Sequence, residues 1–442
     1  MKRLLLFLLA TLVMVLPGFG QAKATAFINA RIIPIVGQPI EQGILLVQNG
    51  KIMAVGDARA VRLSADVTII DLAGKTVMPG IVDTHSHIGG PAGADSTGPI
   101  QPDVRILDSV NVQAASIQRA QAGGITVANL MPGSGHLDSG QTLYLKLRDD
   151  AVKIDDLLIF DKAGKYMGGI KFANGTNPIR AGGGAFPGTR AKSAALVREQ
   201  FIKAQEYKDK VAKAGTDKSK LPARDLAMEA LVEVLDQKRV VHFHTHRHDD
   251  VMTALRLQKE FGFRMVLQHV SEAWKVADEI AKSKIPASII MIDSPGGKLE
   301  TLDVDYKNGV ALEKAGALVG FHTDDGITDS RWFLRSAGVA VRAGMSRDKA
   351  LYGMTMAGAI MLDMQDRVGS LETGKDADFV VLSGDPLSIY TRVEQTWVDG
   401  RKVFDRSVAA DYIFATGGKG AADDGDTAHG IHCFDGDIGG GN

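Results

Sequence analysis

The sequence contains very little cysteine: Cys433 is the only one in 442 residues. One thiol cannot form a disulfide within its own chain, so stability must come from core packing, and we expect Cys433 to be a free thiol in a loose tail. The chain also lacks an excess of charge, with a formal net charge of −1. This near-neutrality argues against a strong electrostatic field for nucleic acid or an anionic membrane.

Apolar runs long enough to span a bilayer are absent beyond the first two dozen residues. That first segment begins with Lys2 and Arg3, continues with an apolar run over residues 4–15, and reaches Ala22-Lys23-Ala24, which fits a small-residue cleavage site. We therefore predict a signal peptide over residues 1–24 and a periplasmic or secreted protein without membrane contact after cleavage. A membrane anchor is the alternative, but the run is short for one.

Strand-like segments occur near both ends of the chain. Residues 25–77 contain β-rich runs around an Asn49-Gly50 hairpin signal, and residues 363–406 contain similar runs around Asp399-Gly400. We expect these two segments to build one small composite β domain. The Gly- and Asp-rich residues 415–442 lack periodicity and are predicted to be disordered, with His429 and His432 a minor candidate for metal capture.

The middle of the chain, residues 78–362, alternates short apolar runs with helical patterns. An example is the helical residues 251–261, the strand-like residues 265–268 and the helical residues 272–283. Such alternation predicts βαβ units and a parallel sheet. We expect an α/β fold in which a (β/α)8 TIM-type barrel carries the small β-sandwich domain. Two consecutive helices, over residues 191–214 and 223–237, indicate an insertion in the barrel.

Histidines cluster at the predicted strand ends. His85 and His87 are two residues apart, so both side chains project from the same face of one strand. Residues 240–248 read as another strand with alternate histidines on one face, namely His242, His244, His246 and His248. Four imidazoles make a poor apolar core, but neutral imidazole is a common zinc ligand.

Two further strand ends add to this set. His269 follows an apolar run, and His322 and Asp324 follow residues 317–321 on one face. The carboxyl ends of barrel strands form the rim where catalytic groups gather. The pattern therefore predicts a divalent metal site, with zinc as the expected ion; satisfied structural histidines are the alternative interpretation.

Several motifs in order along the chain resemble the amidohydrolase superfamily. Residues 78–87, Met-Pro-Gly-Ile-Val-Asp-Thr-His-Ser-His, are similar to its first-strand signature, and residues 123–127 to its second-strand motif. Residues 322–326, His-Thr-Asp-Asp-Gly, resemble its eighth-strand aspartate motif, and residues 368–378 its return segment to the small domain. The resemblance covers about residues 26–406 and is strongest to the imidazolonepropionase-like and prolidase-like branch.

This resemblance implies roles for individual residues. It gives metal ligands at His85, His87, His244, His269 and Asp324. Asp324 would also be the general acid/base, and His269 or His246 would steady a tetrahedral oxyanion. His246 is the rival of His244 as the fifth-strand ligand, one pleat further out. Lys171, inside a short apolar run, matches the lysine that many family members carboxylate to bridge two metals. The site would then hold two ions, and otherwise one. The alternative for Lys171 is a salt bridge or a bond to a substrate carboxylate.

Substrate contacts are expected in the loops after the strands. Candidates for these contacts are Ser134, Arg180, Arg247, Arg331 and His322, since rim arginines can hold a carboxylate bidentately; a solvated surface arginine is the alternative for each. Residues 182–184, Gly-Gly-Gly, are predicted to be a mobile loop rather than a phosphate cradle, because no Lys-Ser/Thr follows them.

The resemblance implies a metal-dependent hydrolase that cleaves a C–N bond in an amide, cyclic amide or dipeptide. The partner is then a small molecule, and a homo-oligomer is left open. A superfamily deaminase is one alternative, but its His-x-x-Glu pattern after the fifth strand is missing, because Arg247 and Asp249 occupy the corresponding positions. An exported, non-catalytic metal or ligand binder is the other.

Overall fold

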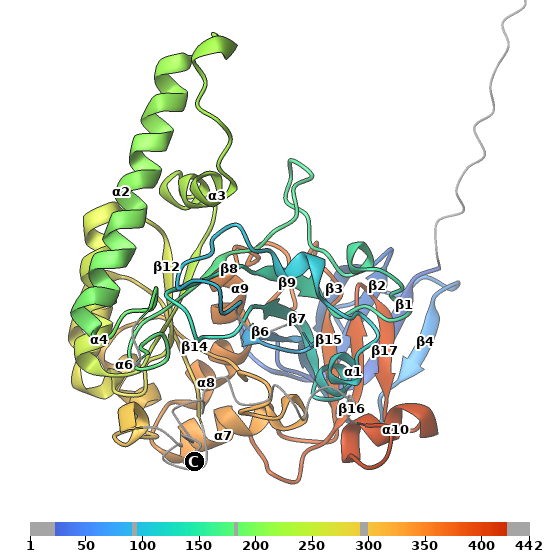
Figure 1. Cartoon of the computed structure of the whole chain (residues 1–442). Helices are drawn as coiled ribbons and strands as arrows, with labels where there is room; N and C mark the ends of the chain where they lie inside the picture. Colours follow the sequence, from blue (N-terminus) through green and yellow to red (C-terminus); the bar gives the residue numbers. More distant parts are fainter. Residues whose placement is uncertain (1–22, 91–94, 181–183, 292–298, 422–442) are drawn as a thin grey trace, which may run out of the picture.

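The structure is a computed structural model that describes residues 23–90, 95–180, 184–291 and 299–421 (Figure 1). The predictions for the signal peptide, for Gly182 and Gly183, and for His429, His432 and Cys433 concern positions outside these residues. Within the described part, no helix combines the length and apolar character needed to cross a membrane.

Strands from both ends of the chain join in one eight-stranded sheet. Its members are β1 (Thr25–Ile32), β2 (Ile40–Gln48), β3 (Lys51–Asp57), β4 (Thr68–Asp71), β5 (Thr76–Pro79), β15 (Phe379–Leu382), β16 (Val393–Val398) and β17 (Arg401–Asp405). The order is β17-β16-β15-β5-β1-β2-β3, with β4 paired to β1. Antiparallel pairing of β5 with β15 is the junction between the two ends.

The hairpin turns of this sheet follow from local sequence. Asn49 and Gly50 have φ angles of 51° and 74°, and Asp399 and Gly400 have 49° and 70°. Positive φ at both central residues is the type I′ geometry, which suits Asn-Gly and Asp-Gly and matches the twist of the flanking strands. Both turns also bond to Ala377, whose N–H donates to Gly50 O and whose carbonyl accepts from Gly400 N–H.

Seven parallel strands carry the carboxyl ends at which the histidines lie. They are β6 (Ile81–Ser86), β7 (Ile125–Leu130), β10 (Ile170–Ala173), β11 (Val241–Thr245), β12 (Met265–His269), β13 (Ala287–Ile289) and β14 (Val319–Phe321). They fall in two sheets, of order β14-β13-β12-β11-β10-β8 and β6-β7-β9. Nearly all of their residues are buried, as expected of strands covered on both faces.

The prediction of a closed, all-parallel barrel is correct only in part. The strands β8 (Asp138–Gln141) and β9 (Leu143–Lys146) pair antiparallel to β10 and β7 respectively, so both sheets are mixed. At the other seam, Asp324 N–H donates to His85 O at 2.9 Å, but no strand ladder joins β14 to β6. The described structure is therefore an α/β fold with an open seam.

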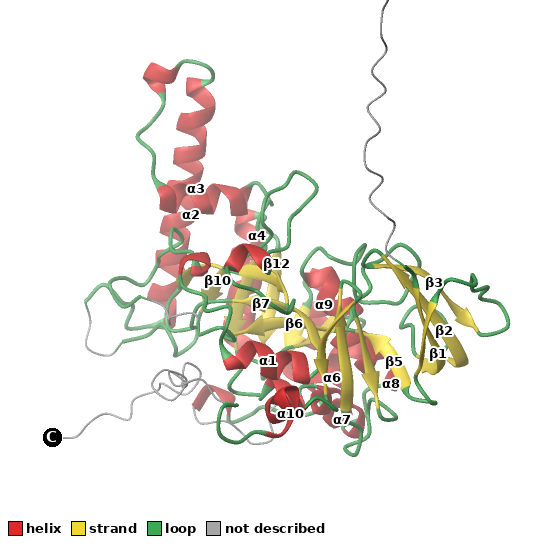
Figure 2. Ribbon diagram, turned by 90° about the vertical axis from the view of Figure 1, so that its right-hand side faces the viewer, coloured by secondary structure: helices red, strands yellow, loops and turns green. Residues whose placement is uncertain are grey.

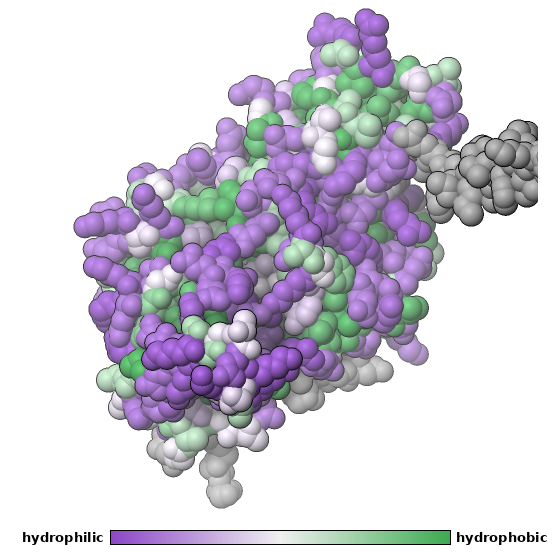
Figure 3. Space-filling model, turned by 90° about the horizontal axis from the view of Figure 1, so that it is seen from above, coloured by the Kyte–Doolittle hydropathy of each residue, from purple (hydrophilic) through white to green (hydrophobic). Residues whose placement is uncertain are grey.

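Helices separate and cover these strands. They are α1 (Ala115–Ala122), α2 (Arg190–Ala214), α3 (Leu226–Leu235), α4 (His248–Phe261), α5 (Ala277–Ser283), α6 (Asn308–Ala315), α7 (Leu334–Arg342), α8 (Arg347–Met354), α9 (Met356–Met361) and α10 (Ala409–Thr416). The expected two-helix insertion is α2 and α3, between β10 and β11, and α2 projects far from the body (Figures 1 and 2). The face in Figure 3 carries mainly hydrophilic side chains, with apolar ones scattered among them.

The alternating histidines predicted one strand over residues 240–248, but the structure shows that these residues do not form one. β11 ends at Thr245, and His248 is the first residue of α4, where its N–H and ring Nδ1 lie 3.0 and 2.6 Å from Glu272 Oε2. His248 continues the alternation of histidines for a different reason: it begins a helix, where its ring lies beside a carboxylate.

A buried lysine joins the eight-stranded sheet to the strands beneath the histidines. Lys146, on β9, is fully buried, and its ammonium donates to Asp376 Oδ2 at 2.6 Å, to Asp378 Oδ1 at 3.1 Å and to Asp399. Asp399 belongs to the β16–β17 turn. The charge of this lysine therefore holds together elements that are far apart in the chain.

Candidate metal centre

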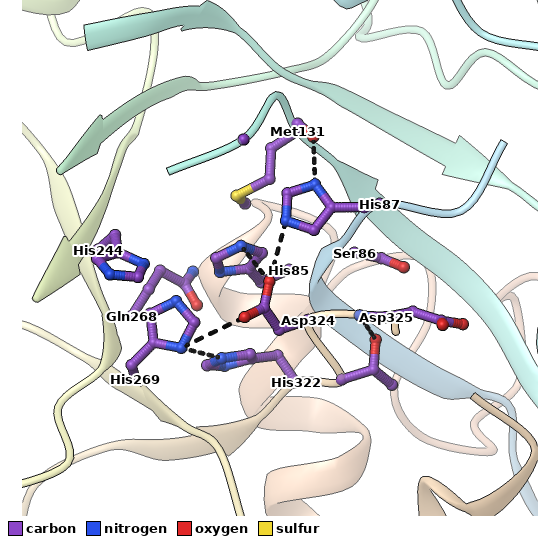
Figure 4. A network of polar contacts seen from close by, with 12 residues as sticks. His85, Ser86, His87, Met131, His244, Gln268, His269, His322, Asp324 and Asp325 are labelled. Atoms are coloured by element: carbon purple, nitrogen blue, oxygen red, sulfur yellow. Dashed lines mark hydrogen bonds and ion pairs between the residues drawn. The ribbon is translucent and has the colours of Figure 1, made fainter. Parts of the chain in front are cut away.

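The first-strand histidines meet the aspartate that follows β14. Asp324 Oδ1 lies 3.2 Å from His85 Nε2 and 2.9 Å from His87 Nε2 (Figure 4). His85 is on β6 and His87 follows its end, while His87 Nδ1 lies 2.8 Å from Met131 O, at the end of β7. The i, i+2 spacing read from the sequence thus places both imidazoles on one carboxylate.

His269 and His322 extend the group below this carboxylate. His269 Nδ1 lies 3.2 Å from His322 Nε2 and 4.0 Å from Asp324 Oδ2. His269 has a φ of 70°, and this turn of the backbone lets it and its neighbour Gln268 both face the interior (Figure 4). Gln268 Nε2 lies 3.1 Å from His242 Nδ1, one layer deeper.

The fourth and fifth strands supply the remaining candidates. Lys171, on β10, is fully buried, with Nζ 2.8 Å from His85 Nε2 and 3.1 Å from Met131 Sδ. The ring centroid of His244, on β11, lies 4.1 Å from that of His269, and that of His246 lies 4.9 Å from it. His246 Nδ1 lies 2.7 Å from Ser271 Oγ. All six predicted ligands therefore lie in one connected cluster.

These side chains fit a divalent cation. Three groups bring possible ligand atoms within 4.8 Å of one another: His85, His87 and Asp324; His244, His246 and His269; and His85, His269 and His322. His85 Nδ1 and His269 Nε2 are buried without a hydrogen-bond partner within the described part of the chain. Buried ring nitrogens without partners are costly in a purely structural cluster, but a ring nitrogen with a free electron pair is the ligand atom that a metal requires.

Burial also sets the protonation states that metal ligands need. It lowers the pKa of His85 and His269 well below the usual range, with neighbouring positive groups adding to the effect, and lowers that of His322 to about 3. Burial alone would raise the pKa of Asp324, but His85, His87 and His269 hold it well below its usual range. At neutral pH the imidazoles of His85, His269 and His322 are therefore neutral and the Asp324 carboxylate is ionised, which are the metal-binding forms.

Hydrogen bonds to the neighbouring strands fix the ligands. Asp83, on β6, accepts from Thr323 N–H at 3.0 Å, from Thr323 Oγ1 at 2.5 Å and from His85 N–H at 3.2 Å. It therefore ties the two strand ends that carry His85 and Asp324. Burial raises its pKa to about 7, against these three donors. Asp83 was not singled out from the sequence, although it lies within the first-strand motif.

Among the predicted substrate residues, His322 and Arg331 lie elsewhere than expected. His322 is fully buried beneath the ligands, with Nδ1 2.9 Å from Ser288 Oγ. Arg331 binds Asp329 and lines a cavity between α7 and α10 to which no metal-centre histidine contributes. The side chain of Arg247 is partly exposed and binds Asp249 at the start of α4.

Arg180 and Ser134 lie in loops that approach the cluster. Arg180 donates to Asn177 O at 2.6 Å and to Gly135 O at 3.2 Å, so it joins the loops after β7 and β10. Asn177 Nδ2 in turn lies 3.1 Å from His244 Nε2. The neighbouring Ser134 is fully buried and its Oγ has no partner among the described residues. Asn177 was not predicted, and a lone asparagine in a loop offered no signal.

Comparisons with known proteins agree with this geometry. The family model described as "Amidohydrolase family" matches residues 76–403. The solved structure of an amidohydrolase from Thermotoga maritima MSB8 is 35% identical, with a TM-score of 0.80, and the match covers 86% of this chain and 100% of that one.

Curated relatives include imidazolonepropionase from Desulfotalea psychrophila, 26% identical over 387 residues, which are 78% of this chain and 86% of that protein. Amidohydrolase tasK from Hapsidospora irregularis is 28% identical over 398 residues, or 83% of this chain, but the match spans only 40% of that longer protein.

The chain therefore belongs to the amidohydrolase family, which confirms the resemblance read from the sequence. It is a metal-dependent hydrolase and an enzyme that acts on C–N bonds.

Proposed function

We propose that the enzyme hydrolyses a C–N bond in a small amide, cyclic amide or dipeptide. The observation that carries this proposal is the placement of the Asp324 carboxylate against His85 and His87. A single carboxylate there serves a metal and a proton transfer together. Zinc is the cation that best suits the proposed ligands, which are His85, His87, His244, His269 and Asp324.

A divalent cation in this cluster would polarise the scissile carbonyl and make water acidic enough to supply hydroxide near neutral pH. Asp324, ionised at that pH, accepts the proton of the attacking water and passes it to the leaving nitrogen. Its carboxylate is oriented by its bonds to the two first-strand histidines. His246, whose ring centroid lies 4.9 Å from that of His269, would supply a donor to the developing oxyanion; His269 is the alternative donor if it does not bind the metal.

Lys171 is proposed to be carboxylated. Lys171 is fully buried beside the proposed metal ligand His85. Burial of an ammonium is costly, whereas a carbamate at this position would be an anion that a divalent cation can bind. The carbamate would add oxygen ligands and allow a second ion. Unmodified Lys171 would instead leave a one-metal site and place a cation near a substrate carboxylate.

Substrate recognition is proposed for Arg180 and Ser134, whose loops meet at Gly135 and reach the cluster through Asn177.

We also propose that the two barrel sheets belong to one (β/α)8 barrel that closes between β14 and β6, with the composite sheet forming a β-sandwich domain. The Thermotoga maritima structure supports this architecture.

The test is a turnover screen of purified protein. N-acyl amino acids, Xaa-Pro dipeptides and cyclic amides would be offered to the chelator-treated enzyme before and after zinc addition, with lactones as C–O controls. We expect turnover of one C–N class that requires added metal. Activity that survives chelation with no residual metal, or cleavage of lactones alone, would contradict the proposal.

A further inference from the structure

A cavity that is distinct from the metal centre lies between α7, the β15–β16 loop and α10; α7 and α10 are at the lower edge of Figure 1. Its volume is about 590 Å³, within the usual range of small-molecule sites. None of the proposed metal ligands lines it. It lies where the barrel helices meet the composite sheet, and such junctions are common positions for ligand sites.

The charges around this cavity are of one sign. Five arginines line it, and no lysine, aspartate or glutamate does; the arginines are Arg331, Arg335, Arg342, Arg392 and Arg406. Converging guanidinium groups repel one another unless an anion lies among them.

Among the described residues, carboxylates outside the cavity pair with two of these arginines. Asp329 binds Arg331, and Glu394 lies 3.5 Å from Arg392. Arg406 donates through Nε to Val393 O at 2.7 Å, an uncharged acceptor. Burial lowers the pKa of Arg406, and Arg392 lowers it further against the attraction of Glu394. In the part of the chain that the structure describes, Arg392 and Arg406 thus share the carboxylate Glu394, so two positive groups face one negative group on this side of the cavity.

Apart from the hydroxyl side chains of Ser388, Thr391 and Thr416, the rest of the lining is mainly apolar, and part of it is exposed. Trp332 is 52% exposed, Ile389 71% and Tyr412 49%. Apolar side chains of this size grouped around one opening mark a binding surface more often than scattered ones do. The ligand that suits both features has an apolar body and an acidic head.

The geometry points to a binding site for an organic carboxylate with an aromatic or aliphatic body. The carboxylate pairs with Arg342, Arg392 and Arg406, since planar guanidinium groups match its two oxygens. The body packs against Trp332 and Ile389. The site does not depend on the proposed reaction.

The experiment is calorimetric titration of the full-length protein with 4-phenylbutyrate and with octanoate. 4-Phenyl-1-butanol, which lacks the charge, and acetate, which lacks the body, are the ligand controls. We expect both amphipathic carboxylates to bind, both controls to bind at least about tenfold more weakly, and affinity to fall as salt is raised.

Variants separate this cavity from the metal centre. Arg342→Gln with Arg406→Gln should weaken binding by roughly tenfold or more, the usual worth of charge-assisted hydrogen bonds. Arg342→Gln alone, at an exposed position of α7, serves if the double variant does not fold, with an expected loss of a few-fold. Arg62→Gln, an exposed arginine of the composite domain, and Asp324→Asn, in the metal centre, should leave the affinity unchanged.

Three results would overturn the inference. They are failure of both carboxylates to bind, equal binding of 4-phenyl-1-butanol, and loss of binding in Asp324→Asn with retention in the arginine variants. The last result would place the probe in the metal centre.

Discussion

Two residues of the metal centre, His269 and Asp324, hold left-handed backbone conformations, with φ angles of 70° and 50°. Residues other than glycine adopt this region at a cost, which asparagine, aspartate and histidine tolerate best, and residues in this conformation gather at functional sites. At His269 the conformation turns a second consecutive side chain inward. At Asp324 it accompanies the donation of its own N–H to His85 O across the seam between β14 and β6.

Asp324 is the residue whose replacement tests the reaction. Asp324→Asn keeps the shape but removes the base, so kcat should fall by roughly 10²–10⁴-fold, the usual worth of a placed general base. The histidines still hold metal, so metal content should fall less than turnover. Steady-state kinetics and metal analysis of the same preparation would show this.

Asp325→Asn is the matched control. Asp325 is buried and accepts from Ser330 Oγ rather than from a metal-centre histidine, and an asparagine oxygen can keep that bond. The kcat of the Asp325→Asn enzyme should therefore fall far less than that of the Asp324→Asn enzyme. A fully active Asp324→Asn enzyme, or a dead Asp325→Asn enzyme, would show that the base has been assigned to the wrong residue.

Lys171 decides the number of ions. If Lys171 is carboxylated, metal analysis should give near two ions per chain, and Lys171→Ala should lose one of them with most of the activity. Lys171→Arg keeps the charge but cannot form the carbamate, so it should behave like Lys171→Ala. One ion per chain together with unmodified Lys171 in the intact mass would contradict the two-metal site.

The sequence indicated which of the metal-centre side chains would lie close together. His85 with His87, and His322 with Asp324, could be paired because a strand repeats its direction every two residues. The inward turn of His269 could not be foreseen, since nothing local requires positive φ there. Arg331 lines the cavity between α7 and α10 rather than the metal centre, because its proximity to Asp324 in sequence does not fix the direction in which the following helix carries it.

At the scale of elements, Lys146 is a buried charged link between the composite sheet and the barrel strands. Lys146→Met should destabilise the fold by roughly 3–5 kcal/mol, because three carboxylates lose their buried partner. Lys51→Met is the control, since Lys51 also binds Asp376 but its side chain is 49% exposed; its loss should cost about 0–1 kcal/mol. Urea unfolding would measure both, and equal losses would refute the special role of Lys146.

Asp376 gives this link a pH dependence. Burial would raise its pKa, but Lys146, Lys51 and Arg367 lower it to about 2 from 3.8. Asp376 therefore contributes at most about 2 kcal/mol to the free energy of unfolding. This contribution is fully present above about pH 4 and is lost as pH falls towards 2. Urea unfolding from pH 5 to 2.5 should show a smaller acid loss in Asp376→Asn than in the parent. Identical slopes would contradict this.

Elements were foreseen where pattern and propensity agree. The Asn49-Gly50 and Asp399-Gly400 hairpins, the helices α2 and α3, and the apolar strand β12 all follow local rules. The antiparallel strands β8 and β9 escaped prediction because strand direction depends on tertiary pairing, and their buried polar residues, such as Asp138 and Gln141, do not read as an apolar run.

At the scale of the whole molecule, export remains a prediction. We expect a mature N-terminus near Thr25, because the Ala22-Lys23-Ala24 site precedes the first strand. N-terminal sequencing of protein recovered outside the cytoplasm should begin within a few residues of it. Exported protein that retains Met1 would contradict cleavage and favour an uncleaved anchor.

The position of β5 between β1 and β15 bears on how the chain is synthesised. One edge of β5 is paired by a strand made early, and the other by a strand made after the whole barrel. At translation rates of ~5–20 residues per second, that edge lacks its partner for tens of seconds. An unpaired edge recruits other strands, so a nascent chain needs either a chaperone over its first hundred residues or delayed folding until the ribosome has released its last strands.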